Sequence, residues 1–320
     1  MRAIELTDEG PTFTARHPEL MPRDGEVVVR VLVAGICETD LQLIRGYMGF
    51  RGVLGHEFVG IAESGPWCGR RVVGEINCPC QTCATCRSGM PNHCPHRTVI
   101  GILNHDGAFA DRVSVPQANL HLVPDELDSR IAVFTEPLEA AFQIPAQVPL
   151  HGNQQVVVLG DGRLGNLCAQ VLRLHAARTL VIGKHERKLA LLNRLGIETA
   201  KLGTVTPEKF ADVVVDCTGS STGFETAVQF VKPRGTIVMK TTVVGTPPMS
   251  LAPIVIDEIT VIGSRCGPFP FALEALRTKR IDVTSLIDGE YSLERGLEAL
   301  ERAGSVGTLK LLLSIGSDSA

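Results

Sequence analysis

The second half of the chain alternates short apolar runs with amphipathic segments, and this pattern restricts the fold more than any other feature. Buried strands are expected at 154–160 (QQVVVLG), 179–183 (TLVIG), 211–219 (ADVVVDCTG), 235–240 (GTIVMK) and 259–264 (ITVIGS). Helices are expected between them, at 164–177, 186–195 and 223–231. Strands that alternate with helices predict an α/β fold with a doubly wound parallel sheet and right-handed crossovers.

The first half has a different sequence pattern, in which short β-rich runs are interrupted by Gly and Pro. Examples are 26–34 (EVVVRVLVA) and 71–73 (RVV), and together they predict a compact, irregular β domain with long loops. Amphipathic helices are expected again at 272–278 and 293–303, before a last apolar run at 308–314. A chain of 320 residues is long enough for two domains, each with a core of its own.

A glycine-rich turn, Gly160-Asp161-Gly162-Arg163-Leu164-Gly165, directly follows the first strand of the second half and opens a helix. The pattern G-x-G-x-x-G is weak evidence alone, but a strand before it and a helix after it are the context that dinucleotide binding requires. The glycines let the backbone approach a pyrophosphate, and the helix N-terminus stabilises its charge. The alternative is a glycine turn without a ligand.

Five of the ten cysteines lie within 17 residues, which indicates metal rather than disulfides in a chain of this length. Four of them follow the pattern Cys80-x2-Cys83-x2-Cys86-x7-Cys94. Four thiolates close a tetrahedron around zinc and leave no open position, so this site is expected to stabilise its loop without doing chemistry. Cys78 could compete as a ligand, although the spacing favours Cys80. The alternative is a set of unligated, reduced thiols.

Three other segments carry metal-ligand chemistry: Cys37 in GICETD, His56 and Glu57 in GHEFVG, and Glu136 in TEPLEA. A thiolate, an imidazole and a carboxylate make a mixed-ligand zinc site that can keep a position open for water or substrate. Each residue also has a structural alternative. Cys37 suits a small core position, His56 a hydrogen-bonded loop, and Glu136 the start of a helix.

Charge and hydropathy exclude some classes of partner. The net charge is −4, from 31 basic and 35 acidic residues, and the two signs are interspersed along the chain. This distribution argues against nucleic acid or a membrane surface as partner. The start, MRAIELTDEG, lacks the basic and apolar regions of a signal peptide, and the chain has no apolar run long enough to span a membrane. A soluble, cytoplasmic protein is therefore expected.

GICETD, GHE, the four-cysteine loop, the EPL of TEPLEA and the later GDGRLG, in that order, resemble the zinc-containing medium-chain dehydrogenases over essentially the whole chain. A glutamate in the EPL position resembles the branch of sorbitol, threonine and glucose dehydrogenases. The resemblance implies a GroES-like β domain (1–145 and 273–320) and a Rossmann domain (146–272), with the active site in the cleft between them. It also implies homodimers or homotetramers, with 259–263 as the candidate edge strand.

The resemblance implies roles for individual residues. Cys37, His56 and Glu136 match ligands of a catalytic zinc, and Glu57 matches a residue that binds this zinc directly or exchanges with water. Thr39 matches the residue that hydrogen-bonds the substrate oxygen. The implied reaction transfers a hydride between an alcohol and NAD(P), with the substrate alkoxide on the catalytic zinc, and needs two zinc ions per chain. Asp40 is expected to orient a zinc-binding imidazole.

The resemblance also assigns parts of the cofactor site. Cys217, Thr218 and Gly219 are expected on the adenine–ribose side, and Val243, Ser264 and Arg265 near the nicotinamide. Arg265 could equally be an ordinary surface residue.

The chain departs from the family pattern in two places. Glu38 replaces the usual glycine after the cysteine, and Gln42 stands where many relatives have a relay histidine. The chain is also short between Gly46 and Gly55, where relatives carry more residues of the substrate pocket. The candidate pocket residues are polar and favour a hydroxylated substrate; they are Glu38, Gln42, Arg45, Asn104 and His105. A polyol, a sugar, an amino alcohol and a secondary alcohol all stay open.

Cofactor choice is expected to favour NADP over NAD. The end of the second strand carries Gly183 where NAD-linked relatives have an acidic residue, and Lys184, His185 and Arg187 follow with charges suited to a phosphate. The alternative is that Glu186 binds the ribose of NAD. At the level of the whole chain, the competing interpretation is a zinc-free quinone reductase or a non-catalytic nucleotide-binding member of the same fold.

Overall fold

A computed structural model describes residues 1–175, 178–242 and 250–317. The chain forms two compact units, of which the first comprises Met1–Glu136, Phe269–Lys279 and Leu286–Ala320. The second unit comprises Pro137–Pro268 and Arg280–Ser285. The sequence analysis places the domain boundaries at 145/146 and 272/273. These positions fall inside helices α4 (Thr135–Gln147) and α9 (Phe269–Arg277). The two boundaries stay predictions.

The first unit is built on a mainly antiparallel sheet. Its strands, in spatial order, are β10 (Leu120–Leu122), β6 (Arg71–Gly74), β5 (Glu57–Ala62), β3 (Glu26–Gly35), β18 (Lys310–Ser314) and β17 (Ile287–Ser292), and β9 (Arg112–Pro116) pairs with β3. The central strand β3 buries Val27, Val29 and Val31 on its alternating positions. Because β18 pairs with β3, the end of the chain lies beside its first long strand.

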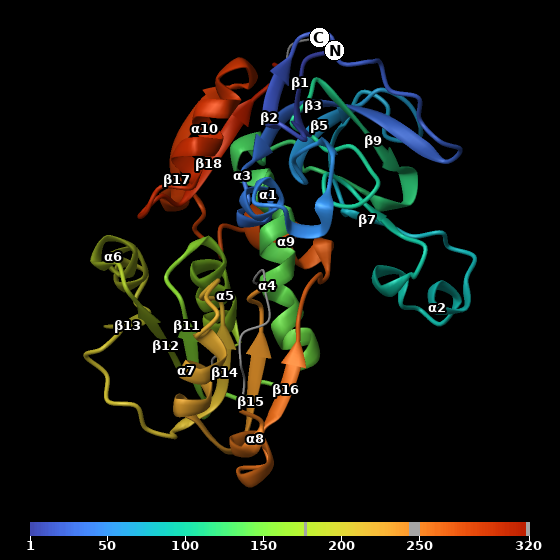
Figure 1. Ribbon diagram of the computed structural model, residues 1–320. Coiled ribbons are helices and arrows are strands. Elements are labelled where there is room, and N and C mark those ends of the chain that lie inside the picture. The colour runs from blue at the N-terminus through green and yellow to red at the C-terminus, as the bar shows by residue number, and fades with distance from the viewer. Residues whose placement is uncertain (176–177, 243–249, 318–320) are drawn as a thin grey trace. The chain divides into compact units, whose positions relative to one another are not determined.

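Two smaller sheets and short helices complete this unit. The sheets comprise β1 (Ala3–Thr7), β2 (Gly10–Thr14) and β4 (Gly52–Val53), and β7 (Asn77–Cys78) with β8 (Thr98–Val99). The helices are α1 (Glu38–Ile44), α2 (Ala84–Arg87), α3 (Ser129–Ala132), α9 (Phe269–Arg277) and α10 (Gly296–Ala303). The 3-10 turns are Tyr47–Gly49, Pro91–His93, Gln117–Asn119 and Leu293–Arg295. Figure 1 shows that the loop with α2 projects from the rest of this unit.

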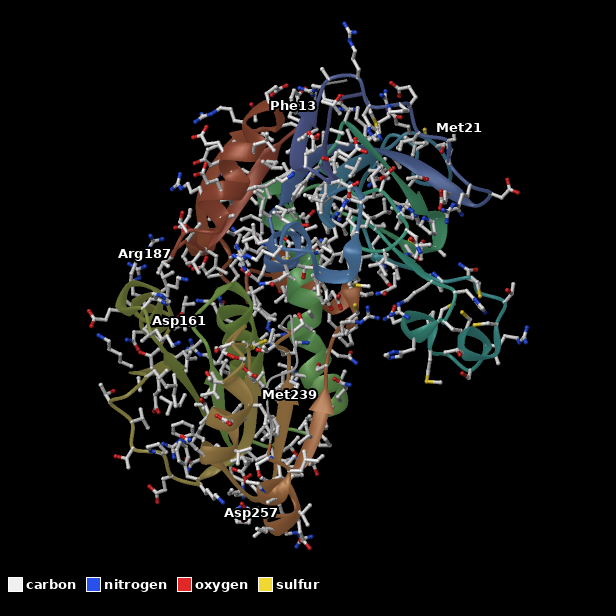
Figure 2. The ribbon with its side chains drawn as sticks, viewed as in Figure 1. Phe13, Met21, Asp161, Arg187, Met239 and Asp257 are labelled. Atoms are coloured by element: carbon white, nitrogen blue, oxygen red, sulfur yellow. The ribbon has the colours of Figure 1, made fainter. Side chains whose placement is uncertain are left out.

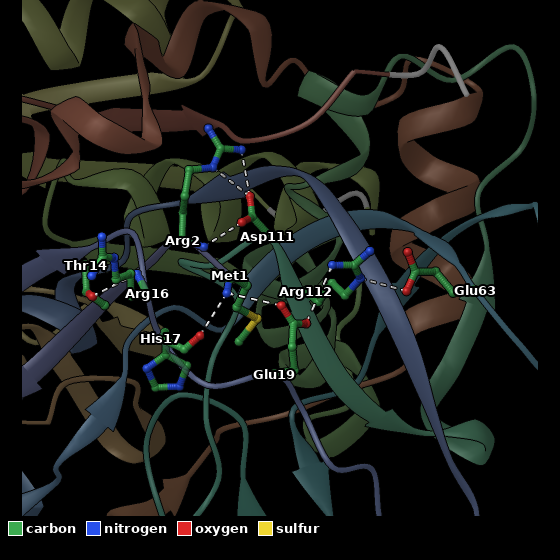
Figure 3. Close-up of polar contacts among 9 residues, drawn as sticks. All are labelled: Met1, Arg2, Thr14, Arg16, His17, Glu19, Glu63, Asp111 and Arg112. Carbon is green, nitrogen blue, oxygen red and sulfur yellow. Dashed lines mark hydrogen bonds and ion pairs between the residues drawn. The ribbon is translucent and has the colours of Figure 1, made fainter.

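The N-terminus is tied to this unit by charge-assisted hydrogen bonds (Figure 3). The Met1 amino group donates to the carbonyl of His17 at 2.8 Å. The Arg2 guanidinium donates to the carboxylate of Asp111 through Nε at 2.9 Å and Nη2 at 2.6 Å. The bonds between Arg2 and Asp111 connect the start of β1 to the residue that precedes β9.

The second unit is the predicted parallel sheet. Its strands lie in the order β13 (Glu198–Lys201), β12 (Arg178–Gly183), β11 (Gln155–Leu159), β14 (Ala211–Asp216), β15 (Val231–Met239) and β16 (Thr260–Gly263), and every neighbouring pair is parallel (Figure 1). The prediction of a doubly wound α/β fold is therefore confirmed. The sequence analysis missed β13, whose polar residues ETAK form an edge strand.

Three helices of this unit are close to those expected, namely α5 (Arg163–Leu174), α6 (Glu186–Arg194) and α7 (Gly223–Phe230). The unit also contains most of α4, the short helix α8 (Ala252–Ile256), which was not expected, and the 3-10 turn Thr284–Leu286. Helix α5 ends earlier than expected, because His175 already leaves the helical conformation as its C-cap. Its face with Leu167, Val171 and Leu172 is buried. Across the described part of the chain, none of the helices has the length and apolar content to cross a membrane.

Candidate metal centres and nucleotide site

Three predicted metal ligands converge in the first unit. Cys37 immediately precedes α1, whereas His56 and Glu57 stand at the start of β5, and one ligand atom of each lies within 4.8 Å of the others. The register of β3 against β5 explains the convergence, since it places Gly35, two residues before Cys37, opposite Glu57. Both His56 and Glu57 are buried.

The donor set fits a zinc ion. Within the described residues, the buried Oε1 of Glu57 has no hydrogen-bond partner. A buried charged oxygen without a partner is costly unless a cation satisfies it. Cys37, His56 and Glu57 offer a sulfur, a nitrogen and an oxygen, the ligand types of open zinc sites.

Asp40, a residue of α1, contacts two of the three converging ligands. Its Oδ2 accepts a hydrogen bond from the backbone N–H of Cys37 at 2.8 Å, and its Oδ1 lies 3.3 Å from Nδ1 of His56. Burial opposes a charge on His56, but Asp40 and Cys37 outweigh it and raise its pKa well above the ordinary value. Asp40 thus fixes the position of Cys37 and faces the imidazole.

Lys310 is a buried cation that the sequence analysis missed. It lies on β18, is 1% exposed, and its Nζ donates to Oε2 of Glu57 and, at 3.2 Å, to the carbonyl of Ile36. The Nζ also lies 5.7 Å from the ring centroid of Phe134. The one signal in the sequence was a lysine inside the apolar run 308–314.

Glu136 lies in the first turn of α4, outside the set of ligand atoms within 4.8 Å. Burial raises the pKa of its carboxyl to about 7; the charge of Glu57 adds to this shift, while His56 and Lys310 oppose it. Its carboxyl group is therefore electrostatically coupled to the cluster. Its role as a zinc ligand stays a prediction.

Thr39 and its neighbours occupy α1. Its hydroxyl lies 3.8 Å from Sγ of Cys37. On the exposed face of the helix, Gln42 Nε2 donates to Glu38 Oε1 at 2.9 Å, and Arg45 lies 3.6 Å from the same oxygen. The carboxylate of Glu38 is thus paired with both the amide of Gln42 and the guanidinium of Arg45.

The four-cysteine loop brings its thiols together around α2. The Sγ–Sγ distances are 3.5 Å for Cys80–Cys94, 3.5 Å for Cys83–Cys86 and 3.8 Å for Cys83–Cys94. A tetrahedron with Zn–S bonds of about 2.3 Å has edges of about 3.8 Å, so these thiols fit one zinc ion. Cys78 is not part of this set of four, and burial raises the pKa of its thiol to about 12.

The glycine-rich turn of the second unit leaves no room for a side chain at two of its three glycines. Gly160 has φ +110°, and a Cβ there would lie 2.6 Å from the carbonyl oxygen of Cys217. A Cβ on Gly165 would overlap the carbonyl oxygen of Gly160. At Gly162, the N-cap of α5, a Cβ would meet no atom within 4 Å, so open space faces the helix N-terminus. Arg163 and Leu164 are the first residues of α5.

Other predicted cofactor residues follow the neighbouring strands. After β14, Thr218 bonds Asp216 through its backbone N–H at 2.9 Å and its hydroxyl at 2.7 Å, and Gly219 has φ +61°. After β16, Ser264 accepts a hydrogen bond from Lys240 at 3.1 Å. Lys240 Nζ also donates to the carbonyl of Arg265 at 3.2 Å.

The remaining two predicted residues are placed as follows. Cys217 lies between β14 and Thr218, with its Sγ 3.7 Å from that of Cys168. Val243 lies outside the described residues.

The segment expected to select the cofactor lies at the end of β12. Gly183 closes this strand, and Lys184 and His185 lead into α6, whose second residue is Arg187. Glu186 pairs with Lys201 of β13 at 2.7 Å on the surface.

Comparison with known proteins agrees with this geometry. The family model for the alcohol dehydrogenase GroES-like domain matches residues 23–125, and the model for zinc-binding dehydrogenase matches 164–278. The chain is 29% identical over 342 residues to a sorbitol dehydrogenase of Halalkalibacterium halodurans, covering 98% of this chain and 99% of the relative. It is 29% identical over 303 residues to the D-altritol 5-dehydrogenase of Agrobacterium fabrum, covering 87% and 88%.

Among solved structures, a putative zinc-binding dehydrogenase from Sinorhizobium meliloti 1021 bound to NADP superposes with a TM-score of 0.86 at 26% identity, covering 98% of both chains. A zinc-free or non-catalytic member of the fold is not supported, because one matching model is that of zinc-binding dehydrogenases and the two relatives given above are named as polyol dehydrogenases. The chain belongs to the zinc-containing medium-chain dehydrogenase/reductase superfamily, and its activity is zinc-dependent oxidoreduction of alcohols or polyols.

Proposed function

We propose that the chain oxidises a hydroxyl group of a polyol or sugar, or reduces the corresponding carbonyl, at a zinc ion held by Cys37, His56, Glu57 and Glu136. The observation that carries the proposal is the convergence of the first three side chains around a buried, unpartnered oxygen of Glu57, counted within the described residues. The relatives named for sorbitol and altritol support a polyhydroxylated substrate.

When bound, zinc supplies a Lewis acid that favours the deprotonated form of an alcohol near neutral pH. The residues of the chain prepare the site for this chemistry. Asp40 holds the backbone of Cys37 and faces His56, while Lys310 fixes one oxygen of Glu57. Thr39, beside Cys37, is placed to accept the proton of the substrate hydroxyl and pass it on through its own.

The second zinc has a structural role in this proposal. Cys80, Cys83, Cys86 and Cys94 would hold it with four thiolates, and no position would stay open for a substrate. Zinc therefore contributes folding free energy to the loop around α2. The expected total is two zinc ions per chain.

NADP(H) is the proposed preferred cofactor, bound at Gly160, Gly162 and Gly165. Gly183 brings no carboxylate of its own that would repel a 2′-phosphate, and Lys184, His185 or Arg187 can supply charge-assisted hydrogen bonds to that phosphate. The alternative in which Glu186 binds the ribose of NAD is weakened, because that carboxylate pairs with Lys201. Cys217–Gly219 would line the adenosine, and Ser264, Arg265 and Val243 the nicotinamide.

A homodimer or homotetramer is proposed as the working form. Strand β16 is an edge of the parallel sheet, and exposed apolar side chains accompany it, namely Leu251, Val255, Ile256 and Val261. Such an apolar surface beside an edge strand favours pairing with a second copy. A cytoplasmic location stays a prediction from the sequence.

The test is a metal assay combined with a substrate screen. About two zinc ions per chain support the proposal, whereas about one, bound by the four-cysteine loop alone, would contradict it. A panel of polyols, sugars and simple alcohols, followed by the absorbance of reduced cofactor, identifies the substrate class. Failure of every hydroxylated substrate and every corresponding carbonyl would refute the proposed reaction.

A further inference from the structure

Asp161, the second residue of the glycine-rich turn, has a side chain that faces the end of the next strand. The residue is 6% exposed, and its Oδ2 accepts hydrogen bonds from the backbone N–H groups of Lys184 and His185, both at 2.6 Å. Its Oδ1 lies 3.0 Å from Nδ1 of His185. The turn is thus bound to the start of α6 through one carboxylate. Asp161 is labelled in Figure 2, as is Arg187 of α6.

This carboxylate is ionised at neutral pH. Burial acts to raise the pKa of Asp161, but the hydrogen bonds from His185 and Lys184 outweigh it and lower the pKa below its usual range. Because a carboxylate only accepts hydrogen bonds, Nδ1 of His185 is the donor. The pair therefore places a negative charge where β12 ends.

Gly183 is required by the same carboxylate. A Cβ on Gly183 would lie 2.5 Å from both Cβ and Oδ2 of Asp161, closer than side-chain atoms approach. Asp161 therefore occupies the space that a side chain at position 183 would need. An acidic group is still present at the end of β12, but it comes from the glycine-rich turn and not from the strand.

The donors that Asp161 occupies are the backbone N–H groups of the N-cap of α6 and of the residue before it. Lys184 and His185 lead into the nine-residue helix α6, with His185 as its N-cap, and N–H groups at such a helix start bind phosphates. The 2′-phosphate of NADP is recognised at the end of the second strand of a dinucleotide-binding sheet, which is β12 here. Asp161 thus occupies donors that a 2′-phosphate could use, and repels it.

We propose that Asp161 is a specificity-determining residue, which lowers the affinity for the 2′-phosphate of NADP(H) relative to the free ribose hydroxyl of NAD(H). This inference rests on the proposed nucleotide site at Gly160–Gly165. Lys184 and Arg187 supply the positive charge that attracts the phosphate, and Asp161 limits that attraction. The balance between them sets the cofactor preference of the enzyme.

The experiment compares two halves of the cofactors, 2′,5′-ADP and 5′-AMP, which differ at the 2′-phosphate. Their binding to the full-length, zinc-loaded protein is measured by titration calorimetry for the parent and Asp161→Asn. We expect 2′,5′-ADP to bind about tenfold more tightly in the variant, since a like charge is removed, and 5′-AMP to change by less than about twofold. Asp161→Ala removes the same charge and serves if the asparagine variant is insoluble.

The matched control is Asp212→Asn. Asp212 also accepts a hydrogen bond from a backbone N–H, that of Gln155 at 2.8 Å, and pairs with Lys232, but it lies at the start of β14. Its substitution should leave the ratio of the two affinities unchanged. An unchanged or lower preference for 2′,5′-ADP in both Asp161 variants would overturn the inference.

The outcomes separate this inference from the proposal on which it rests. A parent protein that binds neither nucleotide refutes the proposed nucleotide site and this inference together. A parent that prefers 5′-AMP refutes the proposed NADP preference alone, and the rise in the ratio on removal of Asp161 then still supports the inference.

Discussion

Replacing Lys310 by methionine tests how the open metal centre is held together. Methionine keeps a long apolar side chain but removes the charge that pairs with Oε2 of Glu57. Both partners are almost completely buried, at 1% exposure for Lys310 and 0% for Glu57. Removing one member of a buried ion pair leaves the other uncompensated, so Lys310→Met should lower the free energy of unfolding of the zinc-free protein by about 3–5 kcal/mol.

Trp67, the single tryptophan of the chain, belongs to the first unit and packs against its core, so its fluorescence during urea unfolding follows that unit. The matched control is Arg51→Met, which removes a cation paired with Asp8 at 2.8 Å on the surface and should cost at most about 1 kcal/mol. Zinc should reduce the loss in Lys310→Met, because it supplies positive charge to Glu57. Equal losses in the two zinc-free variants would refute the reasoning.

Four further predictions concern the two metal centres and the cofactor. Cys37→Ser should lower kcat/KM by more than about 100-fold with an unchanged circular dichroism spectrum and one zinc ion fewer, and near-normal activity without that zinc would defeat the proposed mechanism. Cys83→Ser should reduce the soluble yield and the melting temperature, because a structural zinc contributes folding free energy; a variant that melts like the parent would show that the loop needs no metal. The raised pKa of Glu136, about 7, stabilises the zinc-free protein below the ordinary carboxyl pKa, and this stability should be lost as the pH rises through 7. Urea unfolding at pH 5 and pH 8 should differ by an amount on the order of 1–3 kcal/mol without zinc, and zinc should remove this trend; a zinc-free protein that is more stable at pH 8 would contradict it. Replacing Lys184 and His185 together by alanine should reduce kcat/KM for NADPH by about tenfold more than for NADH, and equal effects on both cofactors would contradict their role.

The sequence was informative wherever a pattern depends on local physics. A parallel strand covered on both faces needs a continuous apolar run, so β11, β12 and β14 could be predicted. The edge strand β13 has the polar sequence ETAK and owes its pairing to β12, which a local pattern does not contain. The four-cysteine loop was equally accessible, since its ligands lie close together in the chain.

Lys310 and Asp161 show where local patterns stop. Lys310 meets Glu57 because β18 pairs with β3, a contact between the two ends of the chain that no spacing predicts. In the pattern G-x-G-x-x-G, Asp161 is only a variable position between two glycines. Its hydrogen-bond partners lie more than 20 residues further along the chain, between β12 and α6. The sequence alone therefore explains Gly183 only by the absence of a carboxylate at that position. The structure adds a steric reason, because a side chain there would overlap Asp161.

The two metal centres differ in what holds them when zinc is absent. In the four-cysteine loop the thiols contact one another and accept hydrogen bonds from within the loop, from Thr82 and from the backbone N–H groups of Cys80 and Cys86. Removing the metal therefore removes the contact that would join all four thiols. In the open centre Cys37, His56 and Glu57 each have a second contact within the first unit. Asp40 holds Cys37 and faces His56, and Lys310 holds Glu57. The open centre should therefore keep its arrangement through loss and reloading of zinc, while the four-cysteine loop refolds around the metal each time.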